Sequence, residues 1–400
     1  MAVWDDLVGQ TKVEEQLAAA ARDADALVTA HAAGEPDPEA SKMTHAWLFT
    51  GPPGSGVETA ARAFAAALQC VSPDRALGGA PGCGFCTGCH TALVGTHADI
   101  TTVAAVGAVV RVEDMRDTVR KSYTAPANGR WQVILVADAE RLNEKSANAV
   151  LKAVEEPAPR TVWLLCAPSI EDVLPTIRSR CRHLNLRTPP VDAVADVLVR
   201  RDGIEPETAH AAARATQGHI DRARRLATDE RARARRAAVL KVPLRVHDVG
   251  GCLKAAQELI DTATEDANQL AEEADTRETE ELKAALGVGP GGRLPRGTAG
   301  VMKDLEADQK RRKKRTQIDS LDLALTDLTG FYRDVLALQL RSRTALANTD
   351  VRDAIERIAH DTTPERTLRR IEAVLACREA LDRQVAPLLA LEAMTLALRD

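Results

Sequence analysis

Aromatic residues make up only 2% of this 400-residue sequence, although hydrophobic residues of all kinds make up 45%. A core with so few rings has to be built largely from Ala, Val and Leu, and this composition favours packed helices. The sequence also lacks any apolar run close to the roughly 20 residues that span a bilayer. Its N-terminal residues lack the basic and apolar blocks of a signal peptide. We therefore expect a mostly helical, cytoplasmic protein with no membrane contact.

The sequence also lacks an excess of positive charge, since its formal net charge is −5. This value excludes wholesale neutralisation of a nucleic acid and leaves only local basic surfaces as possible DNA contacts. The length exceeds the roughly 250 to 300 residues at which a single core stops growing. The chain is therefore expected to form two or three domains.

Short apolar segments alternate with helical patterns over about the first 187 residues. Residues 47–50, 132–137 and 161–166 are apolar except for one terminal residue each, which is typical of strands buried on both faces of a parallel sheet. Between the last two, residues 144–156 repeat apolar positions at helical spacing and stop before Pro157. We expect an α/β domain with a mostly parallel sheet.

Helical patterns dominate the remaining residues to the C-terminus. A charged segment at about 262–315 interrupts them; it contains the Gly- and Pro-rich stretch 287–297 and the six-residue basic run Lys310–Arg315. Such a composition breaks helices and leaves little to pack, so we interpret 262–315 as a flexible insertion between helices.

A glycine-rich loop joins the first apolar strand to a helical pattern. Gly51, Gly54 and Gly56 occupy the glycine positions of a Walker A loop, whose backbone N–H groups cradle phosphates at a helix N-terminus. The motif continues with Lys and then Ser or Thr, which contact the phosphates and Mg²⁺. This sequence has Val57 and Glu58 instead, so one positive charge is lost and a negative one is added. We expect the loop to be kept as a turn that does not bind ATP–Mg²⁺ productively.

The end of the second apolar strand shows a parallel loss. Asp138 stands where a Walker B aspartate would hold Mg²⁺, but the next residue, where a glutamate would polarise water, is Ala139. Glu140 lies one position further, and neighbouring residues at a strand end point in opposite directions. The sequence therefore predicts that this chain does not hydrolyse ATP itself.

Three of the eight cysteines are crowded into one short glycine-rich segment. Such crowding in a cytoplasmic chain indicates a metal site rather than disulfides. Together with a cysteine that ends the preceding helix, they supply four thiolates, the set that closes a tetrahedral structural Zn²⁺ site. The predicted ligands are Cys70, Cys83, Cys86 and Cys89, with His90 and His97 as alternatives to Cys70.

The order of these motifs resembles that of bacterial DNA polymerase III clamp-loader subunits. The matching segments are residues 8–10, 45–56, the cysteine cluster, Asp138 with residues 146–157, and residues 177–181. Gamma and tau subunits keep the Walker lysine and the acidic pair, whereas delta-prime subunits commonly lose them and keep Ser-Arg-Cys. The sequence resembles the delta-prime type.

The resemblance implies a fold and partners. It implies an AAA+ α/β domain with a RecA-like parallel sheet over residues 1–187, carrying the zinc protrusion at 70–89. A small helical lid over 188–230 and an all-α collar over 231–400 are expected to follow. The implied complex contains gamma or tau and delta subunits, the beta sliding clamp and primed DNA.

The resemblance also implies a role for the Ser-Arg-Cys segment. Arg180, between Ser179 and Cys181, is expected to act in trans as an arginine finger at the ATP site of a neighbouring gamma or tau subunit. A guanidinium suits this role because it is always charged and forked. Two departures from the active subunits, Ala167-Pro168 and Asp221 at the two sensor positions, agree with a site that does not use ATP.

Two other functions compete with this interpretation. One is an active ATPase of the same loader that uses another lysine, such as Lys42. The other is a DNA-binding accessory module, in which the basic run at 310–315 contacts several phosphates. A solvated linker is the plain structural explanation of that run.

Overall fold

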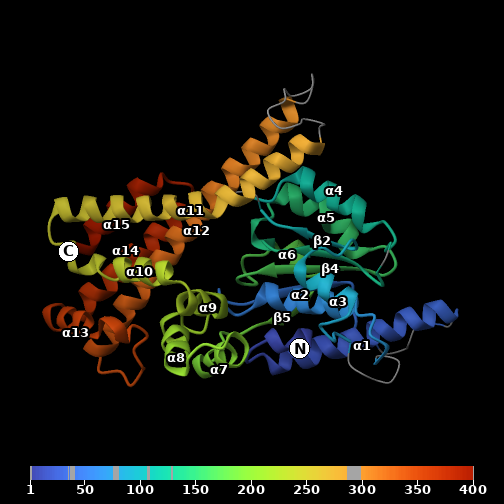
Figure 1. Cartoon of the computed structure of the whole chain (residues 1–400), viewed down its shortest axis with the longest axis horizontal. Coiled ribbons are helices and arrows are strands. Elements are labelled where there is room, and N and C mark those ends of the chain that lie inside the picture. Colours follow the sequence, from blue (N-terminus) through green and yellow to red (C-terminus); the bar gives the residue numbers. More distant parts are fainter. Residues whose placement is uncertain are drawn as a thin grey trace. The chain divides into compact units, whose positions relative to one another are not determined.

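The computed structural model describes residues 2–34, 36, 41–74, 81–105, 109–127, 129–285 and 299–399. Internal contacts divide the chain into two compact units. The first contains Met1–Ala105 and Val109–Arg224, and the second contains Arg225–Asp400. Figure 1 shows strands only in the first unit, whereas the second is built from helices.

A five-stranded sheet forms the centre of the first unit, in the order β2-β3-β4-β1-β5. Every neighbouring pair is parallel. The strands are β1 (Ala46–Thr50), β2 (Ile100–Val103), β3 (Gln132–Val136), β4 (Thr161–Ala167) and β5 (Arg182–Asn185). All residues of β1, β3 and β4 are buried, which confirms the parallel α/β sheet expected from their apolar runs.

Each face of the sheet contributes to a different core because successive strand residues point to opposite sides. Trp47 and Leu164 belong to a core with α1 (Thr11–Ala33) and α2 (Val57–Leu68). Leu48 and Leu165 belong to a second core with α4 (Val112–Ser122) and α5 (Glu144–Glu155). The alternation places helices on both faces, which gives an α/β fold with a parallel sheet between two layers of helices.

The predicted helix at 144–156 is confirmed as α5. It begins after Asn143, whose side chain accepts a hydrogen bond from the backbone N–H of Ser146, and it ends before Pro157. The shorter elements of the first unit are η1 (Val3–Asp6), α3 (Thr87–Val94), η3 (Ala139–Arg141), α6 (Pro175–Arg178), α7 (Val191–Asp202) and α8 (Pro206–Ala215). Helix α9 (Ile220–Thr228) crosses the division between the units.

The second unit confirms the expected all-helical C-terminal region. Its elements are α10 (Glu230–Val239), η4 (Val242–Leu244), α11 (Val249–Ala285), α12 (Ala299–Gln339), η5 (Thr349–Val351), α13 (Arg352–Asp361), α14 (Pro364–Asp382) and α15 (Pro387–Arg399). Leu, Val and Ile side chains fill its core around one aromatic pair, Phe331 and Tyr332.

A buried polar network fixes the second unit internally. Asp334, which is 1% exposed, accepts hydrogen bonds at 2.8 Å from the backbone and side-chain nitrogens of Asn348. The guanidinium of Arg236 bonds Asn348 and pairs with Asp350 at 2.8 Å. A carboxylate this deeply buried requires such donors because an unpaired buried charge is costly.

The segment at 262–315 differs from our expectation of a flexible insertion. Its described parts are helical, 262–285 within α11 and 299–315 within α12, and the glycine-rich stretch 287–297 lies outside the described residues. Arg312 of α12 pairs with Asp275 and with Glu278 of α11, the latter at 2.7 Å. Cross-helix ion pairs and long, continuous helices therefore replace the structureless segment that the charge pattern indicated.

The two long helices lie side by side and extend away from the other helices of their unit (Figure 1). We call the part formed by 264–285 and 299–320 the arm. Further cross-helix bonds join Gln317 to Thr264 at 2.6 Å and Ser320 to Asp266 at 2.9 Å. Specific contacts thus join the two helices of the arm to each other.

The three-domain division at 187 and 230 stays a prediction, since the contacts separate two units and the first continues to Arg224. Over the described residues, every helix is too short or too polar to cross a membrane.

Candidate functional site

The glycine-rich loop runs from the end of β1 to the start of α2, as its motif predicts. Gly54 and Gly56 have φ angles of +87° and +84°, which residues with side chains rarely adopt. A side chain at Gly51 would come within 2.8 Å of the carbonyl oxygen of Leu186. These glycines are therefore required by the turn itself, independently of any bound phosphate.

The two positions after the loop have different surroundings. Val57 packs against the hydrophobic core of the first unit. The Glu58 carboxylate, which is half-exposed, pairs with Arg62 at 2.6 Å one turn further along α2. The side chain at the lysine position is therefore uncharged, and the next one carries a negative charge at the helix N-terminus.

Two polar side chains hold the loop from other elements. The amide nitrogen of the Gln10 side chain donates to the carbonyl of Ser55 at 3.2 Å, and its oxygen accepts from the backbone N–H of Arg187 at 3.2 Å. The ring of His219 lies against Gly54, where a Cβ atom would be 2.7 Å from its Cδ2 atom. Burial lowers the pKa of His219, so the ring is neutral at pH 7.

Sequence reasoning missed these loop contacts. Residues 8–10 served only as a family motif, and residues 218–222 only as the place of a missing sensor arginine. Nothing in the local pattern pairs position 10 or 219 with the loop, because the contacts form between elements far apart in the chain. Asp221, at the sensor position, pairs with Arg224 at 3.4 Å.

Asp138 lies just after β3, at the same carboxyl edge of the parallel sheet as the end of β1, with β4 between the two strands. Its carboxylate is nearly buried and accepts a hydrogen bond from the backbone N–H of Ala105 at 2.8 Å. Ala139, at the position of the catalytic glutamate, is buried and has no polar group to orient water. Ala167, at the other sensor position, is the buried last residue of β4.

Glu140 is the one acid near this edge with an unusual environment. Burial raises its pKa to about 7, and its Oε2 atom has no hydrogen-bond partner among the described residues. Burial raises the pKa of the Cys166 thiol most, and the negative charge of Glu58 raises it further. Glu58, Asp138 and Glu140 all act on that thiol, so three acidic groups gather at the carboxyl end of β4.

Lys42, the alternative phosphate ligand, lies before β1, whereas the glycine-rich loop follows it. The five residues of β1 separate these ends by roughly 17 Å, at about 3.3 Å per residue. The backbone of Lys42 bonds Asp23 and Arg182 instead. Lys42 therefore lies near the opposite end of β1 from the glycine-rich loop and cannot replace the Walker lysine.

Arg180 is exposed, just beyond α6. Its Nε atom pairs with the carboxylate of Glu155 at the end of α5. Its Nη1 atom donates to the carbonyl of Thr176 at 2.8 Å and to the hydroxyl of Ser179 at 3.2 Å. Cys181 packs against the core beneath, and burial raises the pKa of its thiol to about 12. The cysteine and serine thus anchor the segment while the guanidinium stays at the surface.

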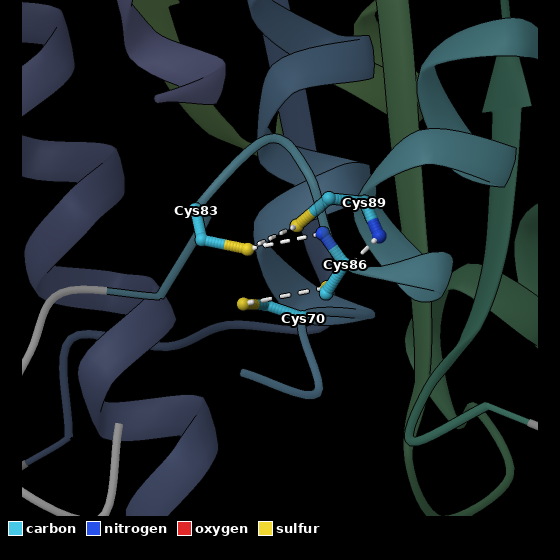
Figure 2. Close-up of side chains that lie close together, drawn as sticks. All are labelled: Cys70, Cys83, Cys86 and Cys89. Carbon is cyan, nitrogen blue, oxygen red and sulfur yellow. Dashed lines mark hydrogen bonds between the residues drawn. The ribbon is translucent and has the colours of Figure 1, made fainter. Parts of the chain in front are cut away.

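The four predicted metal ligands come together beside the other end of α2, and this part of the prediction is confirmed. Cys70 follows α2, Cys83 and Cys86 belong to the glycine-rich segment, and Cys89 lies in the first turn of α3. Their sulfur atoms all lie within 4.8 Å of one another, and Figure 2 shows the side chains converging. Neither His90 nor His97 is part of this group.

The sulfur separations fit a tetrahedral metal. Zn–S bonds of about 2.3 Å place sulfurs roughly 3.8 Å apart; here the Cys83–Cys89 and Cys70–Cys86 separations are 4.0 and 3.9 Å. Backbone N–H groups of Val71 and Cys89 both donate to the sulfur of Cys86, at 3.4 Å. These donors favour thiolate, the form that binds metal.

Local packing fixes the shape of the cysteine cluster. A side chain at Gly88 would collide with the carbonyl oxygen of Gln69, so α3 can pack directly on the end of α2 only with glycine there. The hydrogen bond from Cys89 lowers the pKa of the Cys70 thiol, which favours its thiolate form. The four cysteines can hold a metal ion with no open coordination position.

Two family models match the chain. The model described as "DNA polymerase III, delta subunit" matches residues 36–190, and that described as "DNA polymerase III, delta subunit, C terminal" matches residues 317–399. The stretch between them, 191–316, contains helices α7 to α11 and the first part of α12.

Curated relatives match two fifths or slightly more of the chain. The delta′ subunit of Pseudomonas aeruginosa is 36% identical over 171 residues, which cover 42% of this chain and 51% of that protein. For Escherichia coli delta′ the values are 32% over 182 residues, 45% and 53%. The gamma/tau subunit of Mycobacterium tuberculosis is 32% identical over 166 residues, 40% of this chain and 28% of that protein. The chain thus spans about half the length of the delta′ relatives it matches.

Among solved structures, a DNA polymerase III gamma subunit-related protein from Thermotoga maritima aligns over 88% of this chain and 93% of its own, with 14% identity and a TM-score of 0.36. The two family models, the parallel sheet with its motif positions, and the helical C-terminal unit agree. The chain belongs to the DNA polymerase III delta-subunit family, and it is similar to delta′ subunits and to the related gamma/tau subunits.

Proposed function

We propose that this chain is the delta-prime-type subunit of a replicative clamp loader, which does not hydrolyse ATP itself and supplies Arg180 to a neighbouring gamma or tau subunit. The similarity to delta′ and gamma/tau subunits supports an assembly with these proteins. In that assembly the chain would act with a delta subunit to load the beta sliding clamp on primed DNA.

The absence of ATP hydrolysis is proposed from the side chains at and around the glycine-rich loop. Val57 and Ala139 remove the two groups on which ATP hydrolysis depends, and Glu58 adds a negative charge that opposes a triphosphate. The ring of His219 packs on the loop at Gly54, and Gln10 bonds its carbonyl. The loop therefore keeps its shape through contacts with the protein's own side chains.

The second half is supported by the presentation of Arg180. Three contacts orient its guanidinium through Nε and Nη1, and the ion pair with Glu155 lies at the surface. Exposed ion pairs contribute only about 0–1 kcal/mol, so a phosphoryl group can replace Glu155 at small cost. Preorganised arginines of this kind accelerate phosphoryl transfer by roughly 10³ to 10⁵.

The cysteine cluster would hold one structural Zn²⁺ in this proposal. Four thiolates leave no position for substrate, so the metal would join the end of α2 to α3 without taking part in ATP chemistry.

Arg180→Ala in the reconstituted loader tests the proposal. The complex should assemble normally, while its DNA- and clamp-stimulated ATPase falls partially, because only one of several sites is lost, and clamp loading falls further. Arg180→Lys should restore little, since an ammonium lacks the guanidinium fork. Arg178→Ala is the matched control, because Arg178 is also exposed and lies two residues away at the end of α6.

Normal clamp loading by a correctly assembled Arg180→Ala complex would refute the arginine-donor role. The first half has a separate readout in the isolated chain, which should show only background ATPase. Hydrolysis that disappears on Asp138→Ala would show that the chain is an active ATPase.

A further inference from the structure

The basic run in α12 becomes informative once its residues are placed on a helix. Consecutive residues of an α-helix are separated by about 100°, so a run of six cations cannot face one side. Arg312 points to α11, where it pairs with Asp275 and Glu278. The side chains of Lys310, Lys313 and Lys314 are exposed.

The exposed lysines lie close together on one side of the helix. Lys313 and Lys314 follow Lys310 by three and four residues, spacings that place all three on neighbouring parts of one surface of α12. One turn before Lys310, the exposed Glu306 lies on the same side and offsets the charge of Lys303, one turn further back. We call Lys310, Lys313 and Lys314 the lysine stripe.

The other outer side of the arm has the opposite character. Glu272 and Glu280 are exposed on α11, eight residues apart. The arm therefore presents positive charge on α12 at Lys310, Lys313 and Lys314, and mostly negative charge on α11, where the exposed Arg277 lies beside the two glutamates. A polyanion is attracted to the α12 face and repelled from the α11 face.

We propose that the lysine stripe binds the phosphate backbone of DNA. Neighbouring lysines at spacings of three and four residues lie about 5–6 Å apart, close to the spacing of phosphates along a nucleic-acid strand. On this helix, the forked guanidinium of Arg312 pairs with two carboxylates of α11. The stripe consists of lysines instead, whose ammonium groups act as point charges toward phosphates.

The composition of the stripe argues against a protein partner. Protein interfaces are depleted in lysine and depend on buried aromatic or apolar anchors. The exposed residues at 310, 311, 313 and 314 are all basic, and none offers such an anchor. Backbone contacts of this type bind without reading sequence, and they weaken steeply with salt because bound counterions are released.

Binding of a fluorescein-labelled DNA duplex to the full chain, measured by anisotropy between 25 and 200 mM KCl, tests the proposal. The variant K310Q/K313Q/K314Q removes three charges and keeps side chains of similar helix propensity. Three phosphate contacts contribute about 2.7 to the slope of log affinity against log salt. The wild type should therefore lose about 40-fold more affinity than this variant between 50 and 200 mM KCl.

The matched control is R357Q/R366Q/R369Q, which removes three exposed positive charges from α13 and α14 of the same unit. Its salt slope should equal that of the wild type. Circular dichroism should show equal helix content in all three proteins.

Three outcomes would overturn the proposal. Equal losses in the two triple variants would mean that net charge alone acts. Competition by poly-glutamate as effective as that by DNA, at equal concentration of charge, would point to an acidic protein partner. Absence of binding by the wild type at 25 mM KCl would leave the stripe as a solvated surface. None of these results bears on Arg180, whose role is read from ATPase and loading of the complex.

Discussion

The two ends of helix α2 carry two glycine-rich segments that differ in which ligand-binding side chains they contain. At its N-terminus, the loop at 51–56 keeps the shape of a phosphate cradle, while Val57 and Glu58 stand where its charged and hydroxyl groups would be. Beyond its C-terminus, Cys70 and three further cysteines keep a complete set of metal ligands. A fold can retain a ligand-binding shape after the ligand's chemistry is lost, provided that other contacts support it.

Those other contacts differ between the two ends. Gln10 and His219 contact the glycine-rich loop itself from distant elements. The cysteine segment is bonded by Val3 at Gly82 and by Trp4 at Pro81, but its four sulfurs converge with only weak S–H and N–H hydrogen bonds between them. We therefore expect the loop at 51–56 to keep its shape without a bound phosphate. We expect the cysteine segment to need a metal ion for its stability.

The largest expected effect is at the cysteine end. Cys86→Ser should reduce zinc from about one ion per chain to near zero, because a tetrahedral site closed by four thiolates loses a ligand. The melting temperature of the first unit should fall by roughly 5–15 °C, and the sheet should stay folded on its own core.

Zinc content by mass spectrometry and melting by calorimetry measure this effect. Cys377→Ser is the control, since Cys377 is a buried cysteine of α14 outside the cluster and its loss should leave zinc unchanged. Full zinc content in Cys86→Ser would remove Cys86 from the ligand set and end the contrast between the two ends of α2.

A smaller loss is expected from Gln10→Ala at the loop end. The substitution leaves the carbonyl of Ser55 and the N–H of Arg187 without their donor and acceptor, which costs about 1–3 kcal/mol of unfolding free energy. Urea unfolding measures it, and Gln16→Ala, at an exposed position of α1, should cost little. If Gln10→Ala were as stable as its control, the idea that Gln10 holds the glycine-rich loop in shape would be disproved.

The smallest effect concerns the acidic groups left near the loop. Burial raises the pKa of Glu140 to about 7, from an unfolded value near 4.3, so the folded protein retains a proton that the unfolded chain releases. Stability should therefore decrease as pH rises from about 4.5 through 7, by at most about 2 kcal/mol given partial exposure to solvent.

Glu140→Gln should remove this part of the pH dependence. Urea unfolding at pH 5 and pH 8 should show the variant more stable than the wild type at pH 8 and similar at pH 5. An unchanged difference between the two pH values would mean that Glu140 stays ionised in the folded protein.

Local patterns were sufficient for the sheet, the helix at 144–156 and the cysteine cluster. Apolar runs and close cysteine spacings act within a few residues, so the backbone periodicity and the ligand chemistry can be read directly. The flexibility of 262–315 stays a prediction, but its charge pattern did not indicate that the described parts form helices paired with each other. Arg312 is stabilised by Asp275 and Glu278, more than 30 residues away in the sequence.

The sequence by itself determined the class of the first unit, the loss of the lysine and glutamate positions, and the four candidate ligands. Only the tertiary structure decided that Gln10 and His219 hold the glycine-rich loop, that Glu155 orients Arg180, and that Arg312 faces α11 while Lys310 is exposed on the other side of α12. These are contacts between elements that folding brings together, and their energies depend on burial and direction rather than on local residue order.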